Sequence, residues 1–185
     1  MRNLFIDKQI NYDGTQLAPH WIYKNFNMIG DMICAFIGEV DVQLTEMVDV
    51  EDVINNEPIH SDLMLNFIVE FFGIGLSEGV LRQRLLITTI KETIEKYCDK
   101  KIIRNGDDIF IDGKKLSVSI ATTSSNSVLI HTALNLKSEN TPIPVSTLKD
   151  NAQICNVKEF AKEVMTSYTN EIEDIYFATC KVRGV

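Results

Sequence analysis

The stretch RNGDDIFIDGKKLSVSIAT, residues 104–122, carries the signal that decides the fold. Asp112-Gly113 separates two strand-like runs, and this residue pair suits a type I′ turn, in which both central residues need a positive φ. A two-residue turn fixes the register of the flanking strands, so that Phe110 lies opposite Lys115 and Asp108 opposite Ser117. The sequence therefore predicts a β-hairpin whose tip is this pair.

Alternation along the two strands divides the hairpin into an apolar and a polar face. On the polar face Lys115 lies diagonal to Asp108, within reach of a long side chain. Ser-x-Ser is a poor strand former, which indicates that hydroxyls or free space are wanted there; a solvated face with an ordinary ion pair is the alternative. We expect Ile109, Ile111, Leu116, Val118 and Ile120 on the buried face, and Arg104, Gly106, Asp108, Phe110, Lys115, Ser117, Ser119 and Ala121 on the polar face.

A third strand is predicted over residues 128–136, where four of the even positions are apolar. His131 and Asn135 occupy odd positions. If this strand pairs beside the hairpin, both side chains join the polar face. A lone histidine is more often a structural residue, so both readings stay open.

The rest of the chain predicts a mixed, mainly antiparallel sheet with amphipathic helices packed on its core side, in a single α+β domain over residues 1–185. The apolar run at 63–72 fits a strand or a buried helix, and strand is favoured. Long ordered loops such as 137–150 are often functional. The expected strands are Leu4–Ile10, Met32–Val42 and Leu63–Phe72, the helices are Leu17–Phe26, Leu81–Tyr97 and Val157–Ile172, and the loops are Met47–Pro58, with a helical turn, and Lys137–Asp150, with Pro142 and Pro144.

Composition excludes several classes of protein. The 185 residues are 45% hydrophobic and 24% charged, as in ordinary globular domains. A net charge of −8 disfavours nucleic acid as a main partner. The short apolar run at the start suits no signal peptide, no stretch reaches membrane-spanning length, and the four cysteines are widely spaced. We expect a soluble cytoplasmic protein with reduced thiols and no membrane partner.

Several motifs together resemble the domain-of-unknown-function family numbered 366. They are Tyr12–Leu17, Met47–Asp52, Arg104–Asp108 and Lys115–Thr122, the last followed by Ile130-His131. The resemblance covers nearly the whole chain, but this family has no established activity to carry over.

More remotely, the hairpin resembles the core of biotin and lipoate protein ligases, which share the fold of class II aminoacyl-tRNA synthetase catalytic domains. In those ligases an Asn-Asp pair and a following lysine hairpin place the lysine over an acyl-adenylate. The matching positions here are Asp107 or Asp108 and Lys115. The resemblance implies a ligase-like fold in which Lys115 contacts a carboxylate, phosphate or carbonyl oxygen.

Three hypotheses of function follow. The first is a ligase or acyl-transfer enzyme in which Lys115 stabilises negative charge and Asp108 is its partner. The second is a non-catalytic module that binds a small anionic or carboxylate ligand; a homo-oligomer is compatible with either. The third and weakest is a metal site that uses His20, His60, His131 and the acidic stretch Asp49, Glu51 and Asp52, which no ligand spacing supports. The predicted ligand-binding residues are Arg104, Asp107, Ser117, Ser119, His131, Asn135 and Gln16.

The cofactor stays open. ATP is a candidate through the ligase resemblance, but the glycine-rich segment with which ligases hold their nucleotide is not found between Ile29 and Phe72. The glycine that follows Lys-Leu-Ser in the ligases is Val118 here. The first departure favours a binding module, whereas the retained Arg104, Asp108 and Lys115 favour an enzyme.

Overall fold

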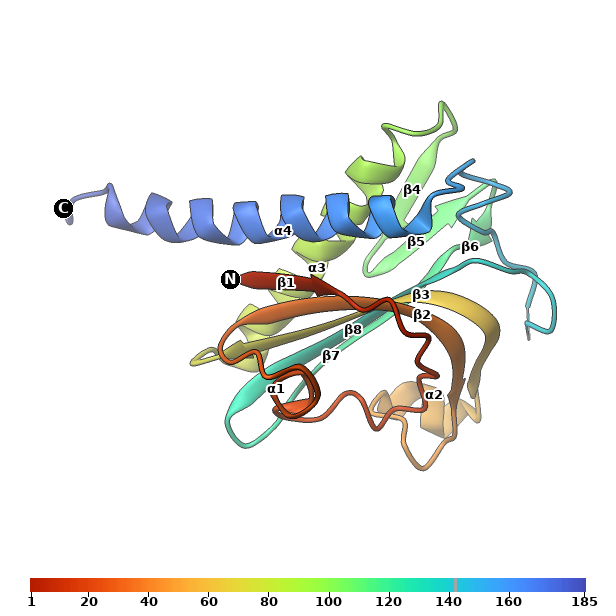
Figure 1. Ribbon diagram of the computed structural model, residues 1–185, viewed down its shortest axis with the longest axis horizontal. Coiled ribbons are helices and arrows are strands. Elements are labelled where there is room, and N and C mark those ends of the chain that lie inside the picture. The colour runs from red at the N-terminus through yellow and green to blue at the C-terminus, as the bar shows by residue number, and fades with distance from the viewer. Residues whose placement is uncertain (142) are drawn as a thin grey trace.

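The computed structural model describes residues 1–141 and 143–185. Two antiparallel or mixed sheets and two long helices make up the molecule (Figure 1). The elements in chain order are β1 (Arg2–Phe5), α1 (Trp21–Phe26), β2 (Met32–Val42), α2 (Val50–Asn55), β3 (Ile59–Phe72), α3 (Leu76–Ile94), β4 (Ile102–Asn105), β5 (Asp108–Ile111), β6 (Lys114–Lys115), β7 (Ser117–Thr123), β8 (Ser127–Asn135) and α4 (Val157–Cys180).

The larger sheet has the strand order β1-β2-β3-β8-β7. Only β1 and β2 run parallel; the other neighbours are antiparallel, which confirms the predicted mixed, mainly antiparallel sheet. The apolar run at 63–72 is part of β3, so the favoured strand is correct. It is almost wholly buried because β3 lies at the centre of the sheet with both faces covered. The smaller sheet, β4-β5-β6, stands beside it.

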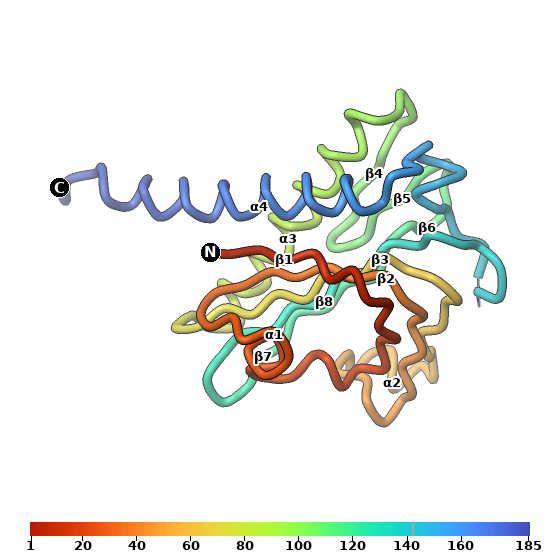
Figure 2. Tube along the Cα trace, in the orientation of Figure 1, coloured from red at the N-terminus to blue at the C-terminus, as the bar shows by residue number. Residues whose placement is uncertain are grey.

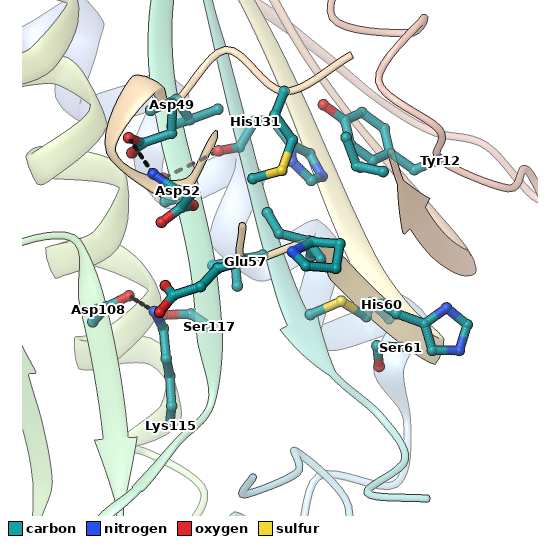
Figure 3. Close-up of a pocket in the computed structure, with 18 of the residues that line it drawn as sticks. Tyr12, Asp49, Asp52, Glu57, His60, Ser61, Asp108, Lys115, Ser117 and His131 are labelled. Carbon is teal, nitrogen blue, oxygen red and sulfur yellow. Dashed lines mark hydrogen bonds and ion pairs between the residues drawn. The ribbon is translucent and has the colours of Figure 1, made fainter. Parts of the chain in front are cut away.

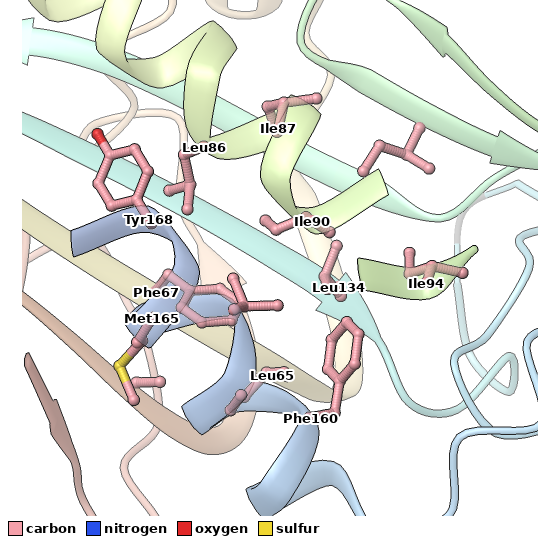
Figure 4. Packing of buried hydrophobic residues seen from close by; sticks show 14 of the residues in the cluster. Leu65, Phe67, Leu86, Ile87, Ile90, Ile94, Leu134, Phe160, Met165 and Tyr168 are labelled. Atoms are coloured by element: carbon pink, nitrogen blue, oxygen red, sulfur yellow. The ribbon is translucent and has the colours of Figure 1, made fainter. Parts of the chain in front are cut away.

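Helices α3 and α4 cover one face of the larger sheet, as predicted (Figure 1). Their apolar sides meet Leu65, Phe67 and Leu134 of the sheet in the main hydrophobic cluster (Figure 4). Phe160 and Tyr168 of α4 are completely buried there. Full burial of such a side chain contributes about 1.5–3 kcal/mol, so this layer holds the helices and the sheet together.

The opposite face of the larger sheet is covered by the segment between β1 and β2, which contains the short helix α1, rather than by long helices. The N-terminal segment that follows β1 passes α1 and then returns into β2, as the tube in Figure 2 shows. A second cluster lies beneath it, with Ile22, Phe36 and Ile68 fully buried. This segment leaves the part of the same face beside α2 free for a cavity.

The element bounds differ from the predictions at several helix ends. Helix α4 starts at the predicted Val157 but runs to Cys180 instead of Ile172, and α3 ends at Ile94 instead of Tyr97. Helix α1 starts at Trp21 instead of the predicted Leu17, after His20 in a left-handed conformation, so Pro19 precedes the helix. Helix α3 begins five residues earlier than the predicted Leu81, because Gly75 supplies an extended residue before Leu76. The first strand is Arg2–Phe5 instead of Leu4–Ile10. The strand Met32–Val42 is confirmed at both ends.

Two polar segments, 47–58 and 137–150, border the free part of the sheet face beside α2, and both were predicted as loops. The segment 47–58 contains α2 as its helical turn, capped by Asp49, whose side chain accepts from two backbone amides. The segment 137–150 has no helix or strand among its described residues; Pro142 lies outside them. No helix in the described ranges is long and apolar enough to cross a membrane.

Candidate functional site

A cavity of about 630 Å³ opens on the face of the larger sheet opposite α3 and α4. Its floor is formed by β3, β7 and β8 (Figure 3). Its walls are formed by α2 with its flanks, by the hairpin of β5 and β6, and by Thr141, Ile143 and Val145. Apolar side chains such as Met47, Met64 and Ile143 alternate with polar ones along it. We call it the acidic cavity, because its described lining includes six carboxylates, Glu46, Asp49, Asp52, Glu57, Asp107 and Asp108.

Lys115 is the one lysine or arginine among the described residues of that lining. Its Nζ lies 3.0 Å from Oδ1 of Asp108, and both side chains are about one-third exposed, at 32% and 29%. The predicted pairing of Phe110 with Lys115 is confirmed, as is the type I′ turn, since Asp112 and Gly113 both have positive φ. The turn therefore places Lys115 beside Asp108, as the sequence indicated.

More carboxylates surround this ion pair than the sequence analysis foresaw. In Figure 3 the Glu57 carboxylate points toward Lys115, and Asp52 projects from α2 on the same side. Burial raises the pKa of the Asp52 carboxyl, the negative charges of Asp49 and Glu57 raise it further, and Lys115 opposes them. Lys115 forms its ion pair with Asp108, and the additional carboxylates make the local charge negative.

Asp107 contributes a further carboxylate in the turn between β4 and β5. Its Oδ1 accepts from Nη1 of Arg84 at 2.8 Å, and its Oδ2 accepts from Nε2 of Gln83 at 3.1 Å. Burial raises its pKa more than Arg84 lowers it, and Asp108 adds to the rise. Helix α3 therefore holds Asp107 in place, while Asp108 next to it binds Lys115.

His131 forms part of the floor and is held in its neutral state. Its ring stacks on Tyr12 with centroids 3.7 Å apart, and Nε2 lies 3.0 Å from Oδ1 of Asn66. Burial lowers the pKa of His131 to about 3, and burial, followed by the charge of Asp13, raises that of Tyr12. Neither ring is charged at neutral pH, so this end of the cavity offers flat neutral surfaces.

Asn135 is the last residue of β8, four residues after His131, and also lines the cavity. Its Nδ2 donates to the Leu116 carbonyl at 3.0 Å, and its Oδ1 accepts from the Ser61 hydroxyl at 3.3 Å. His131 and Asn135 thus share a face of β8, as predicted. Both of Asn135's polar groups are already bonded within the protein.

We predicted that one alternating pattern of faces extends over the whole of 104–122. This prediction is wrong after Leu116, because the chain passes there from the small sheet to the large one. Leu116 donates its N–H to the Ile109 carbonyl in the small sheet, while its own carbonyl accepts from Asn135 in the large one. Beyond this crossing Val118 and Ile120 line the cavity instead of sharing the buried face of Leu116.

Ser117 and Ser119 change face for the same reason. They border the cavity, but they pair with Leu134 and Thr132 on the face covered by the helices. The Ser117 hydroxyl accepts the Ile109 N–H at 2.9 Å. The Ser119 hydroxyl accepts from Gln83 at 2.9 Å and lies 2.8 Å from the Thr132 hydroxyl. In this arrangement both hydroxyls join structural elements to one another.

Arg104 is not on the face of Lys115 either. Asn105 pairs with Asp108 around a second two-residue turn, which reverses the chain and places Arg104 opposite Ile109. Arg104 is exposed, donates to the Gly106 carbonyl, and is absent from the described cavity lining. Gln16 also lies outside that lining: it is buried and bonded to the backbone of Asp13 and Asn11.

Tyr12, Asp52 and Glu57 are cavity residues that the sequence analysis did not select. Polar residues on a short helix give the same sequence pattern whether they face solvent or a cavity. The family resemblance was therefore the one signal that singled out 12–17 and 47–52. His60 lines the cavity too, within 4 Å of Asp41 and Asp62. Across the described chain no three His, Cys, Asp or Glu side chains are grouped as metal ligands.

Comparisons with known proteins agree with this architecture. A structure described as a protein of unknown function from Pyrococcus horikoshi has a TM-score of 0.91 at 34% identity, over 99% of this chain and 98% of that one. A biotin protein ligase mutant from Aquifex aeolicus in complex with biotin has a TM-score of 0.60 at 13% identity, over 94% and 70%. A bipartite lipoate protein ligase from Thermoplasma acidophilum gives 0.59 at 14%, over 93% and 83%.

The two ligases show a shared fold, which confirms the predicted ligase-like architecture, and at such identities they show nothing more. An uncharacterised protein of Methanocaldococcus jannaschii is 35% identical over 181 residues, which cover 95% of this chain and 81% of the relative. Residues 1–183 match the family described as a domain of unknown function, DUF366. The chain therefore belongs to the DUF366 family, whose fold is that of the biotin and lipoate protein ligases.

Proposed function

We propose that the acidic cavity binds a small organic molecule and that Lys115 contacts a carboxylate or carbonyl oxygen of that molecule. A volume of about 630 Å³ is within the range of small-ligand sites. The single observation that carries the proposal is the Lys115 ammonium group, which lies inside this cavity next to apolar walls. A lysine ammonium group is a compact point charge, which suits contact with a ligand oxygen.

The charge balance of the cavity narrows the ligand further. Lys115 already faces Asp108, and Asp52 and Glu57 lie on the same side. A purely anionic ligand would enter next to several negative charges, which costs binding energy in a partly desolvated site. A molecule that also carries an ammonium group would offset that repulsion. The best-supported ligand is therefore a small carboxylate or acyl compound that bears an amine.

Acyl transfer is the second candidate function. When a nucleophile adds to an acyl carbonyl, negative charge develops on the oxygen, and a fixed ammonium group stabilises it. Lys115 would supply that stabilisation and Asp108 would position it. The shared fold of the ligases supports this candidate. Against ATP use, the segment between Ile29 and Phe72 forms β2, α2 and β3 and brings carboxylates to the cavity. We therefore place the non-catalytic binding module ahead of the enzyme, in the reverse of the order that the sequence suggested.

Thermal-shift measurements test these functions with hexanoate, 6-aminohexanoate and ATP. A ligand at one hundred times its dissociation constant stabilises the protein by roughly 2.7 kcal/mol, which shifts the melting temperature measurably. We expect a larger shift with 6-aminohexanoate than with hexanoate. A shift with ATP that grows when the acid is present would support the ligase candidate. No shift with either acid would contradict the binding proposal.

A pair of matched variants tests the role of the cavity carboxylates. Glu57→Gln removes a carboxylate that faces Lys115, whereas Glu51→Gln removes an exposed one on α2 that does not line the cavity. We expect the preference for 6-aminohexanoate over hexanoate to fall in Glu57→Gln and to persist in Glu51→Gln. An equal fall in both would mean that only the net charge of the protein matters.

A further inference from the structure

The C-terminal end of α4 projects beyond the body of the molecule. Figures 1 and 2 show its final turns overlapping no other element. Buried residues of α4 end at Ile172, and from Glu173 to Cys180 every residue except Ala178 is exposed. At 1.5 Å per residue these eight residues extend about 12 Å into solvent. A helix end of this length has no tertiary packing of its own to stabilise it.

The projecting end is apolar where a solvated helix would be polar. Ile175, Tyr176 and Phe177 are 42%, 65% and 55% exposed, and Val182 just beyond the helix is 71% exposed. Ile175 also continues the stripe of Met165, Tyr168 and Ile172, which is buried against the body at alternating spacings of three and four. Contiguous exposed apolar residues of this kind mark interaction surfaces.

Charges along the same segment are ordered by sign. Glu171, Glu173 and Asp174 precede the apolar residues, and Lys181 and Arg183 follow them. None of the five forms an ion pair in the part of the chain that the structure describes. Two such segments in antiparallel orientation would place acidic beside basic residues, whereas parallel pairing would place like charges together.

We propose that the exposed end of α4, residues 171–183, is a homodimer interface on which a second copy of this chain packs its own α4 end in antiparallel orientation. The contact is isologous: each copy supplies the same apolar centre at Tyr176 and Phe177, and its acidic part meets the basic part of its partner. Two short helix ends bury less surface than a standard stable interface. The dimer therefore dissociates on dilution, and salt weakens it.

Sedimentation velocity on the full chain, from about 1 µM to about 1 mM, tests the interface. The wild type should shift from monomer to dimer across this range. Tyr176→Ser with Phe177→Ser should raise the dissociation constant at least about tenfold. Leu81→Ser is the matched control, because it removes an apolar side chain that is 69% exposed on α3, and it should leave the dimer unchanged. A wild type that stays monomeric throughout, or a dimer indifferent to the double substitution, overturns the proposal.

A mixing experiment tests the charge pairing between the two α4 ends that the antiparallel contact requires. One variant carries Lys181→Glu and Arg183→Glu and has an acidic α4 end; the other carries Glu171→Lys and Glu173→Lys and has a more basic one. Each alone should be monomeric where the wild type is dimeric, and an equimolar mixture should form dimers again. If the mixture remains monomeric while both variants keep the wild-type circular dichroism, the antiparallel contact is refuted. The dilution series of the wild type is independent of any folding defect in the variants.

Discussion

Replacing Lys115 with alanine separates the two contributions that this residue makes, one to folding and one to ligand binding. The side chain is about one-third exposed and lies 3.0 Å from Asp108. At that distance the attraction between unit charges is about 1.4 kcal/mol in bulk water. Ordering two long side chains offsets part of it, so we expect Lys115→Ala to lower the free energy of unfolding by about 1 kcal/mol.

Binding of 6-aminohexanoate should suffer more than stability. A hydrogen bond to a charged group contributes roughly 1.5–3 kcal/mol, which corresponds to a roughly ten- to hundredfold rise in the dissociation constant. The assay is urea denaturation together with isothermal titration calorimetry of the same preparations. Lys114→Ala is the control, because Lys114 is exposed one position away and does not line the cavity. Equal losses of affinity in the two variants would refute the assignment of ligand contact to Lys115.

Three further perturbations follow from the geometry. Asp52→Asn should raise the melting temperature at neutral pH. The pKa of the Asp52 carboxyl is raised in the folded protein, so the wild type loses stability as the pH rises through that pKa. Below the pKa of an unfolded aspartate, at about pH 3, the melting temperatures of variant and wild type should converge. Gly38→Ala should prevent native folding in expression and circular dichroism tests, because its Cβ would lie 1.8 Å from the Ile10 carbonyl oxygen. Ser117→Ala should cost about 1–3 kcal/mol in urea denaturation, because the buried Ile109 N–H loses its acceptor.

Each of these variants has a control elsewhere in the chain. Glu51→Gln on the same helix should show no gain in melting temperature that depends on pH. Gly184→Ala lies in open space and should leave folding intact. Ser125→Ala changes an exposed serine in the turn between β7 and β8 and should leave stability within about 0.5 kcal/mol of the wild type. A wild-type-like Gly38→Ala would contradict the close approach of β2 to the N-terminal segment.

The hairpin was predictable because its turn is determined by local chemistry. Asp112-Gly113 selects the positive φ values of the turn, and the turn fixes the pairing of Phe110 with Lys115. The second hairpin was missed although Asn105-Gly106 is itself a turn signal. Reading the whole segment as one alternating pattern placed Arg104 beside Asp108, whereas the chain reverses between them.

The cavity walls depended on long-range contacts that a local pattern does not contain. The carboxylates of 46–57 are compatible with a solvated loop, and nothing in their spacing distinguishes solvent from a cavity. Tyr12 stacks on His131 across more than one hundred residues of chain. The strand change at Leu116 was also invisible, since alternation predicts faces only while a strand stays in one sheet.

Leu116 is the single residue between β6 of the small sheet and β7 of the large sheet. The length of this connection therefore matters as much as the residue that occupies it. Lys115 faces the cavity because one residue separates it from the strand that forms the floor. Adding or removing a single residue there would turn the ammonium group to the opposite side while β7 kept its pairing with β8. A relative that keeps Lys115 can therefore tolerate substitutions at its neighbours 114 and 116–118, whereas a change of one residue in the length of the hairpin is expected to take the cation out of the cavity.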